Sequence, residues 1–277
     1  MLGIVEDRFG NAGKQRNKNM IISRKMLMSA IAATASVVLL MGNIPAAQAT
    51  EYEALSTTDK IQQLLESNPG VTFEEMAEAA KITASEQGTD LDAVLDGALA
   101  EVEVEDRFLQ GEQVQLQRLS GDGPKKATTA ANRSIGTATY KGDVFYSPVS
   151  TAGITHGHSG LYTSKTSIIE APGPGKKVID HSWREVKVAA KSQKQYVKTT
   201  QSKRDAAVRQ SRKYLGKPYN LNFNFNKRSG AAVNCSQLVW LAYKEGAGID
   251  LDSNGGTGVY PSDIMKSKWT VTYQTIR

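Results

Sequence analysis

The stretch NCSQLVWLAYKEG, residues 234–246, predicts a helix whose first residue is the only cysteine of the sequence. Asn234 is a residue type that is strongly favoured as a helix N-cap. Small and apolar residues then recur at helical spacing along one face: Cys235, Leu238, Val239, Ala242 and Gly246. Cys235 is therefore predicted in the first turn of a helix, at the start of its buried face.

A thiol in the first turn of a helix is suited to nucleophilic chemistry. The thiolate is the reactive form, and the unpaired N–H groups of a helix N-terminus favour it through their partial positive charge. The same N–H groups, together with a neighbouring side chain, can bind the oxyanion of a tetrahedral intermediate. An inert thiol that is only the first core residue of the helix is the alternative, and the rest of the sequence has to decide between the two.

The sequence holds three histidines, and two of them lie in THGHSGLY, residues 155–162. A histidine can take the proton of a thiol and return it to a leaving group. In an extended segment His156 and His158 point to the same side, as the first two ligands of a metal site would. No Asp, Glu or Cys follows them at ligand spacing, so no metal is expected. His181 is expected to be a surface or packing residue.

Five short segments occur in one order: GDVF at 142–145, HSGLY at 158–162, IEA at 169–171, LGKPYN at 215–220 and NCSQLV at 234–239. Together they resemble the permuted papain-like hydrolases of the YiiX type, relatives of the NlpC-type cell-wall peptidases. The resemblance spans roughly residues 138–265. In ordinary papain-like enzymes the cysteine precedes the histidine, whereas here His158 lies 77 residues before Cys235. The resemblance therefore implies a circular permutation of the same site.

This resemblance implies a role for each matching residue. Cys235 is the nucleophile, His158 is its base, and Glu170 is the acidic residue that accepts the second ring N–H of the histidine. A solvated strand charge is the alternative for Glu170. Tyr219 and Ser236 are expected to contact the substrate or the oxyanion, with simple packing as the alternative for Tyr219.

Three other positions near these motifs are less certain in role. His156 does not match the family pattern and is treated as a neighbour of His158. His181 competes with Glu170 for the place of third catalytic residue. Gln237 stands where related sequences commonly carry an acidic residue, and a modest effect is expected because the position points away from the Cys235 face.

Residues 1–49 have the order of a secretory signal peptide. A basic stretch precedes an apolar run over 26–41, and Ala47-Gln48-Ala49 follows as a cleavage site, so cleavage is predicted after Ala49. A retained membrane anchor is the less favoured alternative, because the apolar run is short and no basic cluster follows it. Met20 is an alternative start to Met1.

The rest of the chain divides by charge. Residues 51–122 hold 17 acidic and four basic side chains, whereas residues 123–277 hold 24 basic and nine acidic ones. Short acidic helices are predicted over 56–66, 73–85 and 91–104. Residues 50–122 are thus expected to form an acidic prosegment or regulatory region, and segment 51–122 is expected to associate with the basic domain. A solvated spacer is the alternative. Residues 123–136 are expected to be a linker.

Residues 137–277 are expected to form an α+β papain-like domain, a small antiparallel sheet or partial barrel packed on helices. Strands are predicted over 142–146, 159–162 and 166–170, and a basic helix over 203–215. The leading function is a secreted, thiol-dependent amide hydrolase that acts on peptidoglycan without a cofactor. The basic domain favours an anionic cell-wall polymer as partner, and the absence of zinc spacing or a basic and aromatic stripe argues against nucleic acid.

Two rival functions remain open at this point. Lecithin retinol acyltransferase relatives resemble the same permuted fold, so a lipid acyl hydrolase or acyltransferase is one alternative. A catalytically inactive cell-wall-binding module is the other, and it requires an unreactive Cys235.

Overall fold

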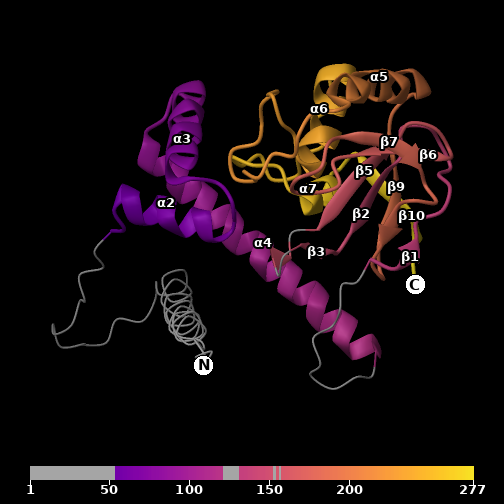
Figure 1. The fold of residues 1–277 in the computed structure, drawn as a ribbon, viewed down its shortest axis with the longest axis horizontal. Coiled ribbons are helices and arrows are strands. Elements are labelled where there is room, and N and C mark those ends of the chain that lie inside the picture. Colours follow the sequence, from indigo (N-terminus) through magenta and orange to yellow (C-terminus); the bar gives the residue numbers. More distant parts are fainter. Residues whose placement is uncertain (1–53, 121–130, 152–153, 156) are drawn as a thin grey trace, which may run out of the picture. The chain divides into compact units, whose positions relative to one another are not determined.

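The computed structural model describes residues 54–120, 131–151, 154–155 and 157–277. Residues 54–277 form one compact unit (Figure 1). The predicted signal peptide with its cleavage site, most of the predicted linker, and His156 lie outside the described residues. Across the described ranges, no helix combines the length and the apolar character that crossing a membrane requires.

A six-stranded antiparallel sheet forms the centre of the domain (Figure 1). Its strands, in spatial order, are β10 (Thr270–Thr275), β9 (Gln193–Val197), β2 (Val144–Ser147), β5 (His158–Tyr162), β6 (Ser167–Glu170) and β7 (Ile179–Ser182). Two short antiparallel pairs accompany it: β1 (Arg133–Ser134) with β8 (Lys187–Val188), and β3 (Ser150–Thr151) with β4 (Ile154–Thr155). The predicted α+β class and the three predicted strands are confirmed.

Three helices complete this part of the fold: α5 (Gln201–Ser211), which continues into the short 3-10 helix η1 (Arg212–Tyr214), α6 (Cys235–Ala247) and α7 (Pro261–Lys266). Helix α6 packs against β5 and against α5. Gly246 lies where the two helices approach, because a Cβ atom there would stand 2.8 Å from the carbonyl oxygen of Ala206. The small residue on the predicted buried face of α6 thus permits the close helix pair.

Apolar side chains fill the space on both faces of the sheet. Alternate residues of a strand point to opposite faces, so neighbouring residues of β2, β5 and β6 enter two different clusters. Val144, Leu161 and Ile169 pack with residues of α6, including Leu238 and Val239. The other cluster contains Phe145, Tyr162, Ile168, Val186 and Val188. The sheet is therefore covered on both sides, and the apolar face of α6 packs against one of them.

The acidic segment folds into α2 (Thr57–Glu66), α3 (Phe73–Gln87) and α4 (Leu91–Ser120). A capping box begins α3, since Thr72 and Glu75 each accept a hydrogen bond from the other's backbone N–H. Helix α4 continues well beyond the predicted end near residue 104. No proline interrupts the sequence from 104 to 120, and its mixture of Glu, Gln, Leu and Arg favours a helix.

The helical segment is attached to the domain through buried contacts. Its own apolar core, which includes Leu64, Met76 and Leu95, also contains Phe225 of the loop before α6. The buried amide of Asn68 accepts a hydrogen bond from the backbone N–H of Phe223 at 2.8 Å. Helices α2–α4 are thus packed onto the part of the chain that carries the sheet.

Helix α4 adds a second set of contacts, to the loop that leads into α7. The carboxylate of Glu101 accepts hydrogen bonds from the backbone N–H groups of Thr257 and Gly258, both at 3.0 Å, and from the Thr257 hydroxyl at 2.8 Å. Four residues on, Glu105 accepts a hydrogen bond from Ser262. Acidic side chains of this segment are therefore used to bind backbone and hydroxyl groups of the domain.

Candidate active site

Helix α6 places Cys235 at its first position. The Asn234 side chain accepts a hydrogen bond from the backbone N–H of Gln237 at 2.9 Å, and the Gln237 side chain accepts one from the backbone N–H of Asn234 at 3.1 Å. This capping box fixes the first turn. The predicted N-cap and helix are confirmed, and the thiol lies among the unpaired N–H groups of the helix end.

His158 and Glu170 come together because β5 and β6 are antiparallel neighbours. Leu161 pairs with Ile169, so continuing the register sets Gly160 opposite Glu170, with His158 two residues away on the same face. His158 Nε2 lies 2.7 Å from Glu170 Oε2. A Cβ atom at Gly160 would stand 2.5 Å from the Phe145 ring and 3.3 Å from Glu170 Cβ. Glycine in the HSG motif therefore leaves the space in which the pair meets.

The remaining ring nitrogen of His158, Nδ1, is left for the thiol of Cys235, with which the histidine forms a hydrogen bond. Burial disfavours the charged histidine, but its hydrogen bonds to Cys235 and Glu170 outweigh burial and raise the pKa of His158 to about 10. Burial likewise disfavours the thiolate, yet the His158 hydrogen bond and charge lower the pKa of Cys235. The arrangement thus favours transfer of the thiol proton to the histidine.

Glu170 is anchored by two histidines rather than one. Its Oε1 atom accepts a hydrogen bond from His181 Nε2 at 2.9 Å, while Oε2 is bound to His158. Burial opposes ionisation of Glu170, but the two histidines lower its pKa to about 2. The expectation that His181 is a surface or packing residue was wrong. Strand β7 runs antiparallel to β6 and carries His181 to the carboxylate, a register that the sequence between the strands does not reveal.

Tyr219 and Ser236, the other two expected site residues, lie differently with respect to the thiol. The Tyr219 hydroxyl lies 4.0 Å from Cys235 Sγ. The Ser236 hydroxyl donates to the carbonyl oxygen of Val259 at 2.7 Å and is fully buried. The serine side chain is thus engaged in holding the loop before α7, whereas the tyrosine faces the reactive atom.

Gln237 is more important to the architecture than its position on the helix suggests. Its side chain is buried. Besides the capping box, its carbonyl accepts a hydrogen bond from Asn220 Nδ2 at 3.0 Å, and its amide donates to the carbonyl oxygen of Arg228 at 2.7 Å. An amide both donates and accepts, as these contacts require, whereas a carboxylate only accepts. The departure from an acidic residue therefore suits the loop that Gln237 holds.

Aromatic side chains surround the thiol. Cys235 has no exposed surface and clusters with Phe223, Tyr260 and Tyr219. The rings of Phe223 and Tyr260 are stacked with centroids 6.1 Å apart, and Tyr260 accepts a hydrogen bond from Asn224 Nδ2 at 3.0 Å. His158 keeps 14% of its side chain exposed. In the described part of the chain, no group of three or more His, Cys, Asp or Glu residues could hold a metal ion.

The chain is similar in sequence to one protein family and to a protein of Bacillus subtilis. The family described as "permuted papain-like amidase enzyme, YaeF/YiiX, C92 family" matches residues 140–274. The uncharacterized protein YycO of Bacillus subtilis (strain 168) is 34% identical over 234 residues, which cover 82% of this chain and 91% of YycO. A solved structure titled "metalloprotein yiiX", from Escherichia coli O157:H7, is similar with a TM-score of 0.36 and 16% identity, covering 49% of this chain and 97% of that one. The chain belongs to the permuted papain-like amidase family of YaeF and YiiX.

Proposed function

We propose that this protein is a cysteine-dependent amidase in which Cys235, His158 and Glu170 carry the reaction. The observation that supports this most strongly is the continuous set of contacts from the helix N-terminus through Cys235 and His158 to Glu170. An ionised thiol, a histidine that can exchange a proton with it, and a group that orients the histidine are the three parts that nucleophilic acyl transfer needs. His181 is a positioning residue, because its hydrogen bond is to Glu170 and not to a reacting atom.

The first half of the reaction forms a thioester. The Cys235 thiolate attacks the carbonyl carbon, a C–S bond forms, and the carbonyl electron pair moves to the oxygen. The first N–H groups of α6, with the Tyr219 hydroxyl beside them, stabilise this oxyanion. When the C–N bond breaks, the amine leaves with the proton from His158 Nδ1.

Water completes the reaction. The neutral His158 takes a proton from a water molecule, the resulting hydroxide oxygen attacks the thioester carbon, and the C–S bond breaks. The carboxylic acid product leaves, and the thiolate and imidazolium pair is restored. Through both steps Glu170 holds Nε2, which fixes the ring and stabilises its positive charge.

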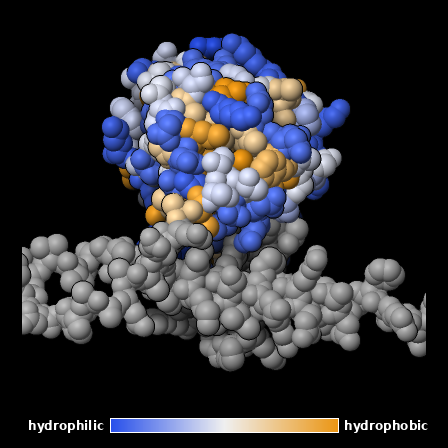
Figure 2. Space-filling model, turned by 90° about the vertical axis from the view of Figure 1, so that its left-hand side faces the viewer, coloured by the Kyte–Doolittle hydropathy of each residue, from blue (hydrophilic) through white to orange (hydrophobic). Residues whose placement is uncertain are grey.

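We further propose that the protein is exported and that its substrate is peptide in the bacterial cell wall. The support is the signal-peptide pattern of residues 1–49 and the excess of basic side chains in residues 123–277. A lipid substrate would need a long apolar groove. Figure 2 shows that, on the face it displays, apolar residues lie in small groups between hydrophilic ones.

A titration of thiolate absorbance tests the proposed chemistry. The thiol is fully buried, so the rate of alkylation would depend on access as well as on ionisation, whereas ultraviolet absorbance measures ionisation directly. We expect a thiolate signal at pH 7 in the wild type that is absent in Cys235→Ala and moves to higher pH in His158→Ala. A wild-type signal that appears only near the ordinary cysteine pKa would contradict the proposal.

The substrate is tested with residues 50–277, which retain the docked helices. Wild type and Cys235→Ala are incubated with purified peptidoglycan and with a panel of phospholipids. We expect new amine and carboxyl termini in peptidoglycan with the wild type alone. Hydrolysis of a lipid that depends on Cys235 would instead favour the acyl hydrolase, and no reaction with either would favour a binding module.

A further inference from the structure

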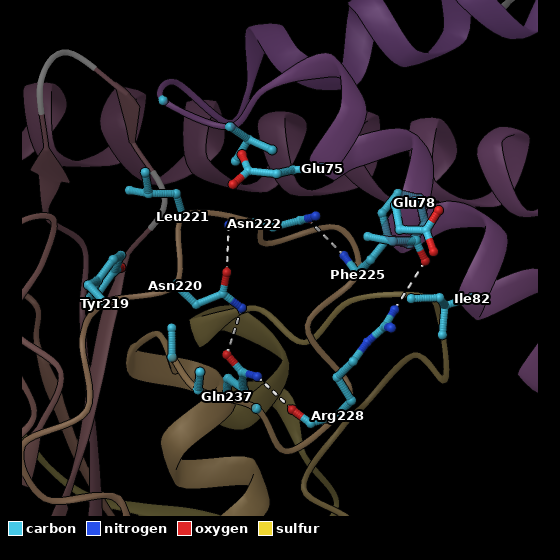
Figure 3. A pocket seen from close by; sticks show the side chains of 16 residues that line it. Glu75, Glu78, Ile82, Tyr219, Asn220, Leu221, Asn222, Phe225, Arg228 and Gln237 are labelled. Atoms are coloured by element: carbon cyan, nitrogen blue, oxygen red, sulfur yellow. Dashed lines mark hydrogen bonds between the residues drawn. The ribbon is translucent and has the colours of Figure 1, made fainter.

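A pocket of about 450 Å³ lies beside the site, between helix α3 and the loop that precedes α6 (Figure 3). Helix α3 contributes Glu75, Glu78, Ala79 and Ile82. Residues of the loop, from Tyr219 to Ala232, and Gln237 of α6 form the other sides. The pocket is therefore built jointly by the acidic helical segment and by the papain-like domain.

Tyr219 connects this pocket to the thiol. Its side chain lines the pocket, and its hydroxyl lies 4.0 Å from Cys235 Sγ. A peptide whose carbonyl carbon is at the thiol can therefore place a neighbouring side chain past Tyr219 and into the pocket. The position is that of a specificity subsite.

Several polar groups on the loop side form hydrogen bonds within the protein. Asn220 Nδ2 donates to the Gln237 carbonyl, and the Gln237 amide donates to the carbonyl oxygen of Arg228. Arg228 itself is tied to α3, with Nη2 donating to the carbonyl oxygen of Ala79 at 3.1 Å and to the Thr83 hydroxyl at 3.0 Å. These bonds fix the loop against α3 and keep the pocket open.

Helix α3 contributes the carboxylates of Glu75 and Glu78 to the pocket. They are three residues apart on α3, so they lie on the same side of the helix, and both line the pocket (Figure 3). Glu75 uses Oε2 to accept a hydrogen bond from the Thr72 N–H. Within the described ranges, neither carboxylate forms a salt bridge. The two negative charges are only partly balanced by Arg228.

Apolar side chains form the rest of the wall: Val71 and Ile82 on the helical side, and Leu221 and Phe225 on the loop side. Aliphatic walls with two carboxylates match a methylene chain that ends in a positive charge. We propose that the pocket binds an aliphatic side chain with a terminal ammonium group, as in a lysine or another diamino acid of the peptide substrate. This inference rests on the proposed amidase function, whose peptide substrate it specifies.

The inference also assigns a function to helices α2–α4. The family match begins at residue 140, so the α3 wall lies outside it. The match to YycO covers 82% of the chain and must therefore extend far upstream of residue 140. The helical segment therefore forms part of the substrate site, whereas a prosegment that is removed on activation would not.

Binding to Cys235→Ala protein, residues 50–277, tests the pocket without requiring turnover. The probes are acetylated and amidated tripeptides whose central residue is lysine, norleucine or glutamate, each in the L and the D configuration. Calorimetry at low salt measures their affinities for Cys235→Ala, for the same protein with Glu75→Gln and Glu78→Gln, and for a matched control with Glu74→Gln and Glu86→Gln. Glutamine at position 75 can still complete the capping box, so α3 is expected to remain folded.

We expect a lysine peptide of one configuration to bind about tenfold more tightly than its norleucine counterpart, and glutamate to bind least. The pocket double variant should lose this preference, and the control double variant should keep it. Equal affinities for lysine and norleucine, no measurable binding of any lysine peptide, or equal losses in both double variants would overturn the inference. Because Cys235→Ala cannot react, this result is independent of whether the thiolate titration supports the amidase.

Discussion

At the scale of single residues, each oxygen of the Glu170 carboxylate is bound to a different histidine. In the proposed mechanism His158 exchanges the proton, whereas His181 holds the other oxygen at 2.9 Å and keeps the buried carboxylate ionised. A carboxylate with a single partner could rotate away from the His158 ring. His181 therefore restricts the orientation of Glu170 and, through it, that of the general base.

We expect His181→Ala to lower kcat by about three- to tenfold, the effect of losing one charge-assisted hydrogen bond. The pKa of Glu170 should rise from about 2, because burial is then opposed by His158 alone. In the folded protein the pKa of Glu170 lies below its ordinary value of 4.5. The stability that ionised Glu170 contributes is therefore complete above pH 4.5 and is lost as pH falls towards 2. In His181→Ala this loss should begin at higher pH.

Activity and thermal unfolding, measured from pH 3 to pH 8, check this expectation. His181→Gln offers an amide donor and should restore part of the wild-type profile. Glu185→Gln is the matched control, since Glu185 approaches the other ring nitrogen of His181 only at 3.8 Å and is exposed. If activity and stability of His181→Ala fall at the same acidic pH as in the wild type, His181 contributes packing alone and does not act on Glu170.

At the scale of the elements, the sequence predicted what depends on neighbours along the chain. The capping residues Asn234 and Thr72 define where α6 and α3 begin, and the apolar spacing after Cys235 identifies the buried face of α6. The place of His181 could not be predicted in this way, because it depends on how β7 aligns with β6. The pocket could not be predicted either, because Asn68 and Phe223, which join its two sides, are 155 residues apart.

Helix α4 carries a buried acid whose ionisation should weaken its docking. Burial, together with the charges of Asp263 and Asp106, raises the pKa of Glu105 to about 7 against the opposing effects of Ser262 and Lys266. The folded pKa lies above the unfolded value of 4.5, so the stabilisation is complete below pH 4.5 and is lost as pH rises through 7. Stability from this helix is therefore greatest in mildly acidic solution.

We expect Glu105→Gln to raise the free energy of unfolding by about 2–3 kcal/mol at pH 8 and to change it little at pH 4.5. The amide has nearly the shape of the acid and can still accept the hydrogen bond from Ser262. Denaturant unfolding at the two pH values measures the difference. Glu103→Gln, at a partly exposed position of the same helix that faces Arg107 at 3.6 Å, should shift stability by less than about 0.5 kcal/mol at both pH values. An equal gain for Glu105→Gln at both pH values would show that its charge is not the cause.

At the scale of the whole molecule, the acidic and basic halves of the chain share one interior. Phe225 of the domain packs in the core of helices α2–α4, and Asn68 of the helices holds the backbone beside the aromatic cluster around Cys235. Removing the helices would expose this apolar surface and leave the loop from Tyr219 to Ala232 without support on one side. The acidic helices and the basic domain thus carry opposite charges and are also joined by buried apolar and hydrogen-bonded contacts.

This arrangement predicts the outcome of cutting the chain between the two halves. A recognition site for a specific protease, placed within residues 121–130, allows cleavage of the folded protein between α4 and β1. We expect the two fragments to remain together in gel filtration at moderate salt, because their contacts are apolar and hydrogen-bonded as well as ionic. Activity on a lysine-containing peptide should be retained, and it should fall once the fragments are separated in denaturant and the domain is refolded alone. If the helices instead dissociate on cleavage and activity increases, they are an inhibitory prosegment, and the α3 wall of the pocket does not serve the substrate.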